Sequence, residues 1–336
     1  MLVRGQAYFF TLGVPLYRYF IRKDVTVYMA GGKLDNAKDA KNDEFYTQLT
    51  DVSKELMHYK QHFKDKIVLC NCDDPTWSAF WKYFHLNFSA LGLKKLISTH
   101  YDKTEPTYKM EYKGGDDNNI EVGVKTPLEG NGDFRNQECL DLLDEADIVV
   151  TNPPFSLFRE YVAVLMEHKK KFLIIGNKNA ITYKEFFPLL KNEDVWIGCT
   201  GPSEFLQPDG SIKKFGNIGW FTNLDVAKRH EKLILWKKYT PEEYPKYDNY
   251  DAINVNKVAD IPVDYDGVMG VPISIMDKYN PEQFEIVGFW NTGHAGDVIG
   301  AAQCEAVSAG KTIVWNGPTV NGKTKYFRIL IRKKQV

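Results

Sequence analysis

The chain lacks three features that would assign it to a class at once. No apolar run approaches the roughly 20 residues that a membrane-spanning helix needs. The formal net charge is -1, so no overall basic field points to nucleic acid. The five cysteines (Cys70, Cys72, Cys139, Cys199 and Cys304) have no repeating spacing, and no second pair completes a metal site with Cys70 and Cys72. We therefore expect a soluble, cytoplasmic protein with reduced thiols, no bound metal and no membrane contact.

Positive charge is nevertheless concentrated at one end of the chain. The last sixteen residues contain no acid and six basic side chains, which are Lys323, Lys325, Arg328, Arg332, Lys333 and Lys334. A basic tail of this kind is either a solvated surface or a segment that contacts phosphates. The sequence leaves both interpretations open.

The first 28 residues differ in character from the rest. They are apolar, aromatic and basic, but basic residues and Pro15 interrupt the apolar core, and no small-residue cleavage site follows, so a signal peptide is not indicated. A second methionine, Met29, precedes a polar lead-in to a helix. We expect Met29 to be the functional start and residues 1–28 to be an upstream extension.

From residue 43 onward, helical and strand patterns alternate. Helices are expected at 43–63, 76–92, 136–146, 157–170 and 182–192, and strands at 66–75, 94–102, 147–151, 171–177, 195–200 and 217–225. Turn residues between two alternating runs predict a hairpin insertion over 108–125. This order predicts an α/β fold with a mostly parallel sheet, in which ligands bind at the carboxyl ends of the strands.

Beyond about residue 229 the alternation ends. The segment is rich in Tyr, Asn, Asp and Pro, with strands expected only at 271–276, 284–290 and 326–332. We therefore predict a catalytic domain over 29–228 and a loop-rich C-terminal recognition region over 229–336.

The motif Asn152-Pro153-Pro154-Phe155 follows the buried strand expected at 147–151. It suits a flat exocyclic amine, which donates two hydrogen bonds and is a poor nucleophile. The Asn152 side-chain oxygen and the Pro153 carbonyl can each accept one of them. The prolines restrict the backbone, so both acceptors are preset, and Phe155 can stack on a base. A plain turn is the alternative reading of the same residues.

Taken with the segments around it, the motif resembles a known family. "NDEFYTQ", "CNCDDP", "GDFR", "DIVVTNPPFSLF", "YPKYDNYDAINVNK", "GVMGVPI" and "YFRILI" occur in the order found in EcoRI-type adenine-specific DNA methyltransferases, from about Asn42 to Lys334. The resemblance implies a Rossmann-like sheet, with methyl transfer from S-adenosylmethionine to N6 of an adenine in double-stranded DNA. It also implies that the adenine is flipped out of the duplex. The family belongs to restriction–modification, but a stand-alone enzyme is equally compatible with the sequence.

The resemblance also implies a cofactor site. Phe45, Tyr46 and Thr47 match the segment that lines the cofactor pocket, and Asp133 matches the carboxylate that meets the adenine amino group of the cofactor. The corner after the first strand supplies Asn71, Cys72, Asp73 and Asp74. Asp73 and Asp74 are candidates to accept from the cofactor's amino group or to cap the next helix, a role that Pro75 favours for Asp74.

Two departures from the common pattern limit the assignment. The corner "VLCNCDDPTWSAFW" contains no glycine, although a Gly-rich loop is usual there. Segments 201–220 and 291–320 do not follow the EcoRI-type pattern, so the recognition sequence is not transferable.

Three alternatives remain at this point. RNA adenine-N6 and protein glutamine-N5 methyltransferases use the same amine-binding motif, and a non-catalytic DNA-binding relative is the third. We expect a monomer, because an asymmetric single-chain reader can methylate each strand in separate visits.

Overall fold

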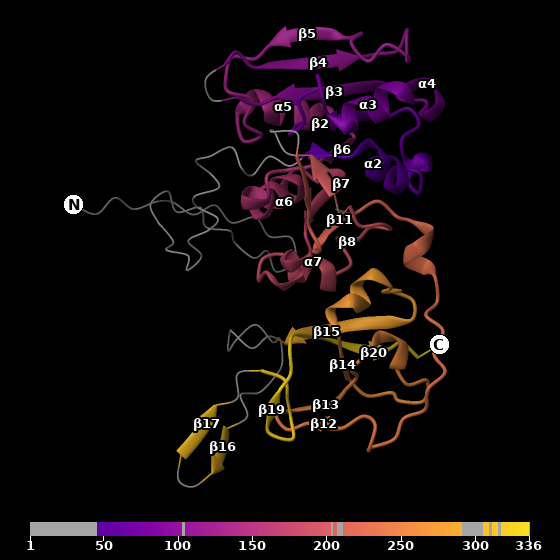
Figure 1. The fold of residues 1–336 in the computed structure, drawn as a ribbon, viewed down its shortest axis with the longest axis vertical. Coiled ribbons are helices and arrows are strands. Elements are labelled where there is room, and N and C mark those ends of the chain that lie inside the picture. The colour runs from indigo at the N-terminus through magenta and orange to yellow at the C-terminus, as the bar shows by residue number, and fades with distance from the viewer. Residues whose placement is uncertain are drawn as a thin grey trace, which may run out of the picture.

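The structure is a computed structural model. It describes residues 46–102, 105–202, 204–206, 211–290, 305–308, 311–314 and 317–335. Figure 1 shows one large sheet with helices on both faces and, below it, a second sheet formed by the C-terminal part of the chain. The predicted extension 1–28, the start at Met29 and the cofactor residue Phe45 lie outside the described residues.

Eight strands form the larger sheet, in the order β5-β4-β3-β2-β6-β7-β11-β8. Their bounds are β2 Ile67–Cys70, β3 Lys95–His100, β4 Tyr108–Tyr112, β5 Val124–Pro127, β6 Ile148–Thr151, β7 Lys171–Asn177, β8 Trp196–Ile197 and β11 Ile218–Thr222. The central strands β3, β2, β6 and β7 are parallel. The pairs at both edges are antiparallel.

The prediction of a mostly parallel sheet is therefore right for the centre and wrong for the edges. On one edge, the predicted hairpin insertion is confirmed as β4 and β5, which lie antiparallel beside β3. On the other edge, β11 runs against both β7 and β8. The strands β2 and β6, whose carboxyl ends carry the predicted site, lie at the parallel centre.

The helices lie where they are predicted but are shorter, and Tyr46–Thr47, within the helix predicted at 43–63, form strand β1 instead. Their bounds are α2 Leu49–Leu56, α3 Ala79–Leu86, α4 Phe88–Leu91, α5 Gln137–Glu145, α6 Phe158–Glu167 and α7 Phe187–Lys191. Single 3-10 turns are η1 Lys60–His62, η2 Phe155–Leu157, η3 Lys178–Thr182, η4 Ala227–His230, η5 Val258–Asp260 and η6 Ile273–Asp277. The helix predicted at 76–92 breaks into α3 and α4 at Asn87 and ends, as predicted, at Gly92, whose φ of 64° favours glycine.

Of the two alternatives for Asp73 and Asp74, capping of the next helix is not the one found. Helix α3 begins only after Ser78, whose hydroxyl accepts from the backbone N–H groups of Phe80 and Trp81 at 3.1 and 3.3 Å. A serine in this position satisfies the otherwise unpaired first-turn donors. Asp74 instead closes a turn four residues earlier, where it accepts from the backbone N–H of Thr76 at 2.8 Å.

Side chains of the central strands alternate between two hydrophobic clusters. Leu69, Val149 and Ile174 face α5, α6 and α7, and their sequence neighbours, Val68, Val150 and Leu173, face α2 and α3. Both faces of the sheet are therefore covered, which explains why these strands are continuous apolar runs in the sequence.

Five strands form the C-terminal sheet, in the order β12-β13-β14-β20-β15. Their bounds are β12 Lys246–Tyr247, β13 Tyr250–Asn254, β14 Met269–Val271, β15 Phe284–Trp290 and β20 Arg328–Lys333. The strands predicted at 284–290 and 326–332 are confirmed. The strand predicted at 271–276 is wrong: β14 ends at Val271, and η6 follows Pro272, which has no N–H to donate to a strand partner.

Three small sheets complete the described chain. They consist of β1 Tyr46–Thr47 with β9 Glu204–Leu206 and β10 Ile212–Lys214, of β16 Glu305–Ser308 with β17 Lys311–Val314, and of β18 Thr319–Val320 with β19 Lys323–Thr324.

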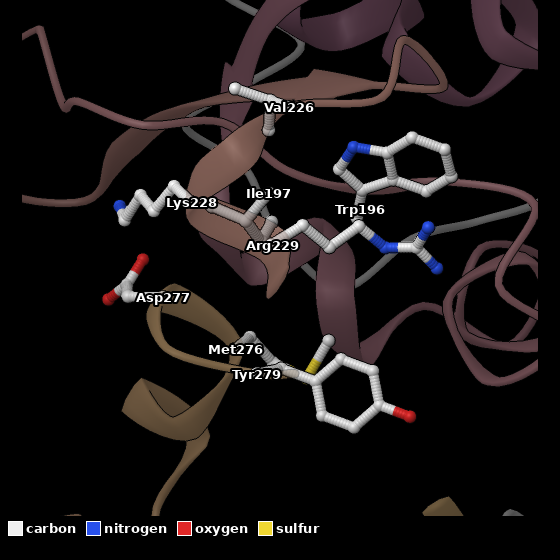
Figure 2. A pocket seen from close by; sticks show the side chains of 8 residues that line it. All are labelled: Trp196, Ile197, Val226, Lys228, Arg229, Met276, Asp277 and Tyr279. Atoms are coloured by element: carbon white, nitrogen blue, oxygen red, sulfur yellow. The ribbon is translucent and has the colours of Figure 1, made fainter. Parts of the chain in front are cut away.

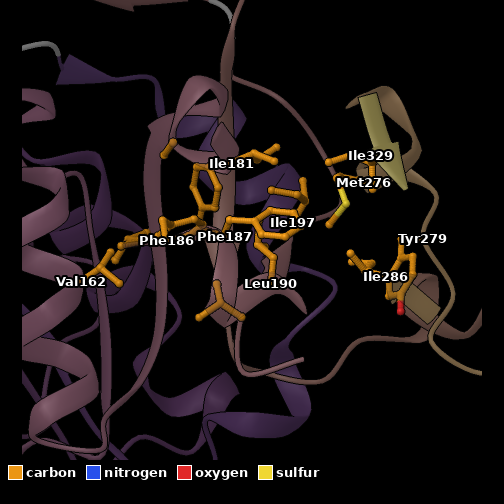
Figure 3. Close-up of a cluster of buried hydrophobic side chains, with 14 of the residues drawn as sticks. Val162, Ile181, Phe186, Phe187, Leu190, Ile197, Met276, Tyr279, Ile286 and Ile329 are labelled. Atoms are coloured by element: carbon orange, nitrogen blue, oxygen red, sulfur yellow. The ribbon is translucent and has the colours of Figure 1, made fainter. Parts of the chain in front are cut away.

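The two large sheets are joined by a continuous hydrophobic core. The rings of Phe187, on α7, and Phe289, on β15, lie 4.3 Å apart between centroids. Figure 3 shows α7 side chains and Ile197 on one side of this junction and Met276, Tyr279, Ile286 and Ile329 on the other. An ion pair between Lys178 and Asp277, at 2.7 Å, crosses the same junction. The division at residue 229 stays a prediction, since side chains from both sides of it pack in one cluster.

A pocket of about 20 Å³ lies at this junction, between Trp196, Arg229 and Tyr279 (Figure 2). The Arg229 guanidinium lies 3.9 Å from the centroid of the Trp196 ring and pairs with Glu193 at 3.0 Å. The volume has room for about one water molecule. The pocket is therefore a packing gap and not a cofactor site.

Replacing Phe289 with alanine should lower the free energy of unfolding by about 3–5 kcal/mol, because it removes a buried ring from the shared core and leaves a cavity. Urea unfolding measures this. The matched control is Trp236→Ala, which removes an aromatic that is 68% exposed and should change stability by about 0.5 kcal/mol or less. A loss below about 1 kcal/mol for Phe289→Ala would show that the junction contributes little.

Candidate catalytic and cofactor site

The predicted site residues meet at the carboxyl ends of two adjacent parallel strands. Strand β2 pairs with β6 through Val68 with Ile148 and Leu69 with Val149. The corner that begins at Asn71 therefore lies beside the corner that begins at Asn152. Sequence separates the two corners by about 80 residues, and the parallel register brings them to one edge of the sheet.

The Asp73 carboxylate ties the two corners together. One of its oxygens accepts from the Thr151 hydroxyl and from the Asn152 backbone N–H, the latter at 3.3 Å. The other accepts from the Ser78 hydroxyl at 3.2 Å. Asp73 was predicted to bind the cofactor or to cap a helix. Here its carboxylate fixes the backbone of the motif Asn152-Pro153-Pro154-Phe155, which is predicted to be catalytic, and reaches α3 through the Ser78 cap.

Burial raises the pKa of this carboxylate. Asp73 is 7% exposed, and the loss of water raises its pKa from 3.8 to about 6. Hydrogen bonds from Thr151, Asn152 and Ser78 favour the charged form and limit the rise. Near neutral pH the group is ionised and accepts from all three donors.

Asn71 and Cys72 are held by bonds to neighbouring elements. The Asn71 side-chain oxygen accepts from the Tyr161 hydroxyl on α6, and its carbonyl accepts from the Thr99 hydroxyl on β3 at 2.9 Å. The Cys72 backbone N–H donates to the Thr151 hydroxyl at 3.2 Å. Burial, with Asp73 nearby, raises the pKa of the Cys72 thiol well above its ordinary value, so the thiol is neutral.

Asp74 faces the opposite flank of the corner, towards β3 and β4. Its carboxylate contacts the His100 ring nitrogen Nδ1 at 2.9 Å and accepts from the Tyr108 hydroxyl at 3.0 Å. Burial and the Asp74 charge raise the pKa of Tyr108. Asp74 therefore orients two side chains, His100 at the end of β3 and Tyr108 at the start of β4.

Asp133 lies in the loop that packs against the end of β3. A Cβ on Gly132, which has a φ of 73°, would lie 2.4 Å from the His100 carbonyl oxygen, so the close approach requires glycine. The Asp133 carboxylate accepts from the Arg135 guanidinium at 2.7 and 2.9 Å. Burial acts to raise the pKa of Asp133, but the bonds from Arg135 outweigh it and hold that pKa below its ordinary value.

Strand β1 forms a cover beside the catalytic motif. It pairs antiparallel with β9, with Thr47 opposite Phe205, and the Phe205 ring lies edge-on to Phe155 at 6.5 Å between centroids. Thr47 is 7% exposed, and its hydroxyl has no hydrogen-bond partner among the residues that the structure describes. Tyr46 pairs through its backbone with Leu206.

The predicted catalytic motif itself forms a rigid corner. Pro153 is buried, and Asn152, Pro154 and Phe155 are half-buried. The Pro154 carbonyl accepts from the Leu157 backbone N–H at 3.0 Å, which begins η2. No donor within the described part of the chain occupies the Pro153 carbonyl oxygen.

Several residues of the site were not singled out from the sequence. Thr151 and Ser78, the two hydroxyl partners of Asp73, had only weak signals: a polar end to an apolar strand and a serine before a helix. Phe205 had none, because it lies in a segment that departs from the family pattern. Glu55, on α2, is fully buried and accepts from the backbone N–H groups of Cys199 and Thr200 at 2.7 and 2.6 Å, which anchors the chain that leads to β9.

Within the described ranges, no group of three or more His, Cys, Asp and Glu side chains is placed to hold a metal ion. None of the helices described there is long and apolar enough to cross a membrane.

Comparison with known proteins places these residues in context. The family model described as "Adenine-specific methyltransferase EcoRI" matches residues 33–334. The chain is 45% identical to the Type II methyltransferase M.EcoRI of Escherichia coli, over 90% of this chain and 97% of that protein. It is 38% identical to the Type II methyltransferase M.MpnI of Mycoplasma pneumoniae, over 90% of this chain and 98% of the relative. A third relative, M.MgeORF184P of Mycoplasma genitalium, is 36% identical over 90% of this chain and 99% of its own length. No solved structure matches the chain significantly.

Replacing Asp73 with asparagine should change how stability depends on pH. A carboxylate whose pKa is raised on folding favours the folded state below its unfolded pKa, and that contribution is lost as pH rises through the folded pKa, here between about 4 and about 6. The Asp73→Asn variant has no carboxylate at this position, so it does not lose this part of its unfolding free energy as pH rises. Its unfolding free energy relative to the parent protein should therefore rise by up to about 3 kcal/mol from pH 4 to pH 7, which corresponds to about two pKa units. Urea unfolding at each pH measures the difference, and a difference that does not vary with pH contradicts the assignment.

Proposed function

We infer the roles of individual residues from one premise: the chain belongs to the family of EcoRI-type adenine-specific methyltransferases. It is therefore an adenine-specific DNA methyltransferase of the kind found in Type II restriction–modification. Membership of this family removes the support for the three alternative interpretations, which were an RNA methyltransferase, a protein-amide methyltransferase and a non-catalytic DNA-binding protein. Which residues bind the cofactor and which act on adenine is our proposal.

We propose that S-adenosylmethionine, the donor that the methyltransferase class implies, binds at the carboxyl ends of β2 and β3, with β1, which pairs with β9, as a cover. It supplies a methyl group that is already activated on a sulfonium sulfur. The buried Thr47 hydroxyl supports this placement, because a buried polar group without a partner is costly unless a ligand satisfies it. The residues proposed to line the site are Phe45, Tyr46, Thr47, Asn71, Cys72, Asp74 and Asp133.

Asp133 and Asp73 have different proposed roles. Each carboxylate oxygen has about two lone-pair positions, so Asp133 can accept from the cofactor's adenine amino group while it holds Arg135. Asp73 already serves three protein donors, and we assign it a positioning role: it holds the Asn152 backbone at a fixed distance from the cofactor corner.

The single observation that carries the catalytic proposal is the corner at Asn152. The Asn152 side-chain oxygen and the Pro153 carbonyl would accept the two N–H groups of the target amine, and Phe155 would stack on the flipped base. Acceptors fixed by prolines stabilise the positive charge that develops on nitrogen during transfer without having to reorganise. No general base is needed at the moment of transfer, because the proton can leave afterwards.

We further propose that the enzyme works as a cytoplasmic monomer on double-stranded DNA. The buried free thiols of Cys70 and Cys139 are consistent with a reducing compartment. A single asymmetric chain reads one orientation of a site at a time, so two visits suffice to modify both strands.

Replacing Asn152 with alanine should abolish most methyl transfer while cofactor binding persists. The protein is incubated with labelled S-adenosylmethionine and unmodified plasmid DNA, and nucleoside mass spectrometry then identifies the product. The parent protein should give N6-methyladenine. The variant should lose about 100- to 1,000-fold in turnover, by analogy with the loss of one preorganised transition-state contact.

Asn118→Ala is the control, because Asn118 is exposed between β4 and β5. Near-parental turnover of Asn152→Ala would refute the role of Asn152. Absence of N6-methyladenine with the parent protein, when the cofactor is bound, would refute the substrate.

Replacing Thr47 with valine should have opposite effects on stability and on cofactor binding. Valine keeps the shape and removes the buried hydroxyl, so the cofactor-free protein should gain about 1 kcal/mol in unfolding free energy. S-adenosylmethionine should bind about 3- to 15-fold more weakly, the value of one lost hydrogen bond. Calorimetric titration measures the affinity, and Thr126→Val, on β5, is the matched control. Unchanged affinity in Thr47→Val would remove this residue from the proposed site.

A further inference from the structure

The basic C-terminal segment divides into two groups in the structure. Four of its six cations are used within the protein. Arg328 donates to the carbonyls of Tyr326 and Phe327, Arg332 pairs with Glu285 at 3.2 Å, Lys333 with Asp266 at 3.4 Å and Lys334 with Glu193 at 3.7 Å. These four are accounted for by the C-terminal sheet and its neighbours.

The other two cations lie on the β18–β19 hairpin or directly after it. Lys323 is exposed and Lys325 is half-buried, and neither forms an ion pair or a side-chain hydrogen bond with any residue in the described ranges. Tyr326 follows them with 81% of its surface exposed. Two unpaired lysines next to an exposed aromatic are a combination that suits a nucleic-acid backbone.

The hairpin that carries them is unusually well anchored. Its turn residues, Asn321 and Gly322, have φ values of 50° and 72°, which is the geometry of a tight two-residue hairpin turn. The Asp248 carboxylate accepts from both turn N–H groups, at 3.1 and 2.8 Å. The backbone N–H of Asp248 in turn donates to the Thr319 carbonyl at 2.8 Å.

A second set of bonds holds the base of the hairpin. The Lys325 N–H donates to the Pro318 carbonyl at 2.6 Å, and the Asn249 side chain donates to the Gly317 carbonyl at 2.8 Å. The exposed side chains therefore project from a fixed backbone. Fixing a contact loop beforehand lowers the entropy cost of binding.

In the view of Figure 1, the hairpin lies on the same side as the carboxyl end of β3. In Figure 1, β4 is drawn pointing right, and β3 runs antiparallel to it, so β3 ends on the left of the view. The strand β19 lies below on the same left side, near β16 and β17.

We propose that the β18–β19 hairpin is a DNA-backbone contact, in which Lys323 and Lys325 bind phosphates and Tyr326 packs against the adjacent sugar. The proposal rests on the function proposed above, because it requires duplex DNA as the substrate. Contacts of this kind position the duplex and carry no sequence information. They would set the register of the DNA relative to the catalytic corner.

The test is DNA affinity as a function of salt. The probe is a fluorescent duplex that contains the site found by sequencing methylated plasmid, and anisotropy gives Kd from 50 to 300 mM salt. The double variant Lys323→Ala/Lys325→Ala should lower the slope of log Kd against log salt by about 2, and affinity should fall about tenfold or more. Tyr326→Ala should weaken binding about 3- to 10-fold with the slope unchanged, because it removes no charge.

The matched control is Lys232→Ala/Lys238→Ala, which removes the same charge from the exposed chain between β11 and β12, on the right of Figure 1. It should leave the slope within experimental error. A slope in the hairpin variant that equals that of the parent or the control would overturn the proposal.

Methylation at saturating DNA separates this proposal from the proposed function. At low salt and saturating DNA the hairpin variants should still form N6-methyladenine, and their defect should appear as a higher KM for DNA, because the three residues act in DNA binding. If the parent protein makes no N6-methyladenine, the proposed function fails. If the parent methylates DNA but the hairpin variants keep its salt slope, only the hairpin contact fails.

Discussion

The Asp73 carboxylate is the constraint on which the rest of the site depends. Three donors converge on it, two from the end of β6 and one from the residue that caps α3, so the corner after β2 cannot move without moving the backbone of Asn152. A neutral side chain with a single acceptor oxygen could not serve all three donors in this geometry. Burial of the charge is costly and raises the pKa to about 6, and the three donors are what keep the charged form near neutral pH. Under the proposed mechanism, this linkage fixes the distance between methyl donor and acceptor amine, on which transfer depends.

The corner without glycine is explained by the same network. A Gly-rich loop normally allows the backbone to turn tightly and approach a ligand. Here side chains close the turn instead. Asp74 accepts from Thr76, Ser78 caps α3, and the Ser98 hydroxyl on β3 donates to the carbonyls of Cys70 and Asp73. Hydrogen bonds from polar side chains thus hold the turn in this segment, where a Gly-rich loop would rely on the conformational freedom of glycine.

Features that depend on neighbours in sequence could be predicted, and features that depend on distant pairing could not. The strands at 147–151 and 171–177 are continuous apolar runs because both faces are covered, and a run of that length is visible without a structure. The motif at Asn152 was visible because its prolines follow such a strand. The pairing of Thr47 with Phe205 was not, because strands of two or three residues carry no periodicity and their partners are some 160 residues apart. The strand predicted at 271–276 was wrong for a similar reason. The apolar residues of this segment are buried from a 3-10 turn, and a short buried apolar run alone does not distinguish a strand from such a turn.

The shared core between the two sheets bears on how recognition and chemistry are coupled. If a flexible linker joined a separate reading domain to the catalytic sheet, binding a site would leave the adenine free to sample many positions relative to the methyl donor. Phe187 packs directly on Phe289, and Phe289 stacks with Phe327 at 5.4 Å, next to Arg328 at the start of β20. The chain from the β18–β19 hairpin enters that strand within four residues. In the proposed complex, packed aromatic rings, and not a flexible linker, would therefore connect the hairpin that holds the duplex to α7. This helix covers one face of the large sheet. Under the proposed roles of the hairpin and of Asn152, choice among neighbouring adenines can then be made by geometry, because only a base at one distance from the hairpin would reach the corner at Asn152.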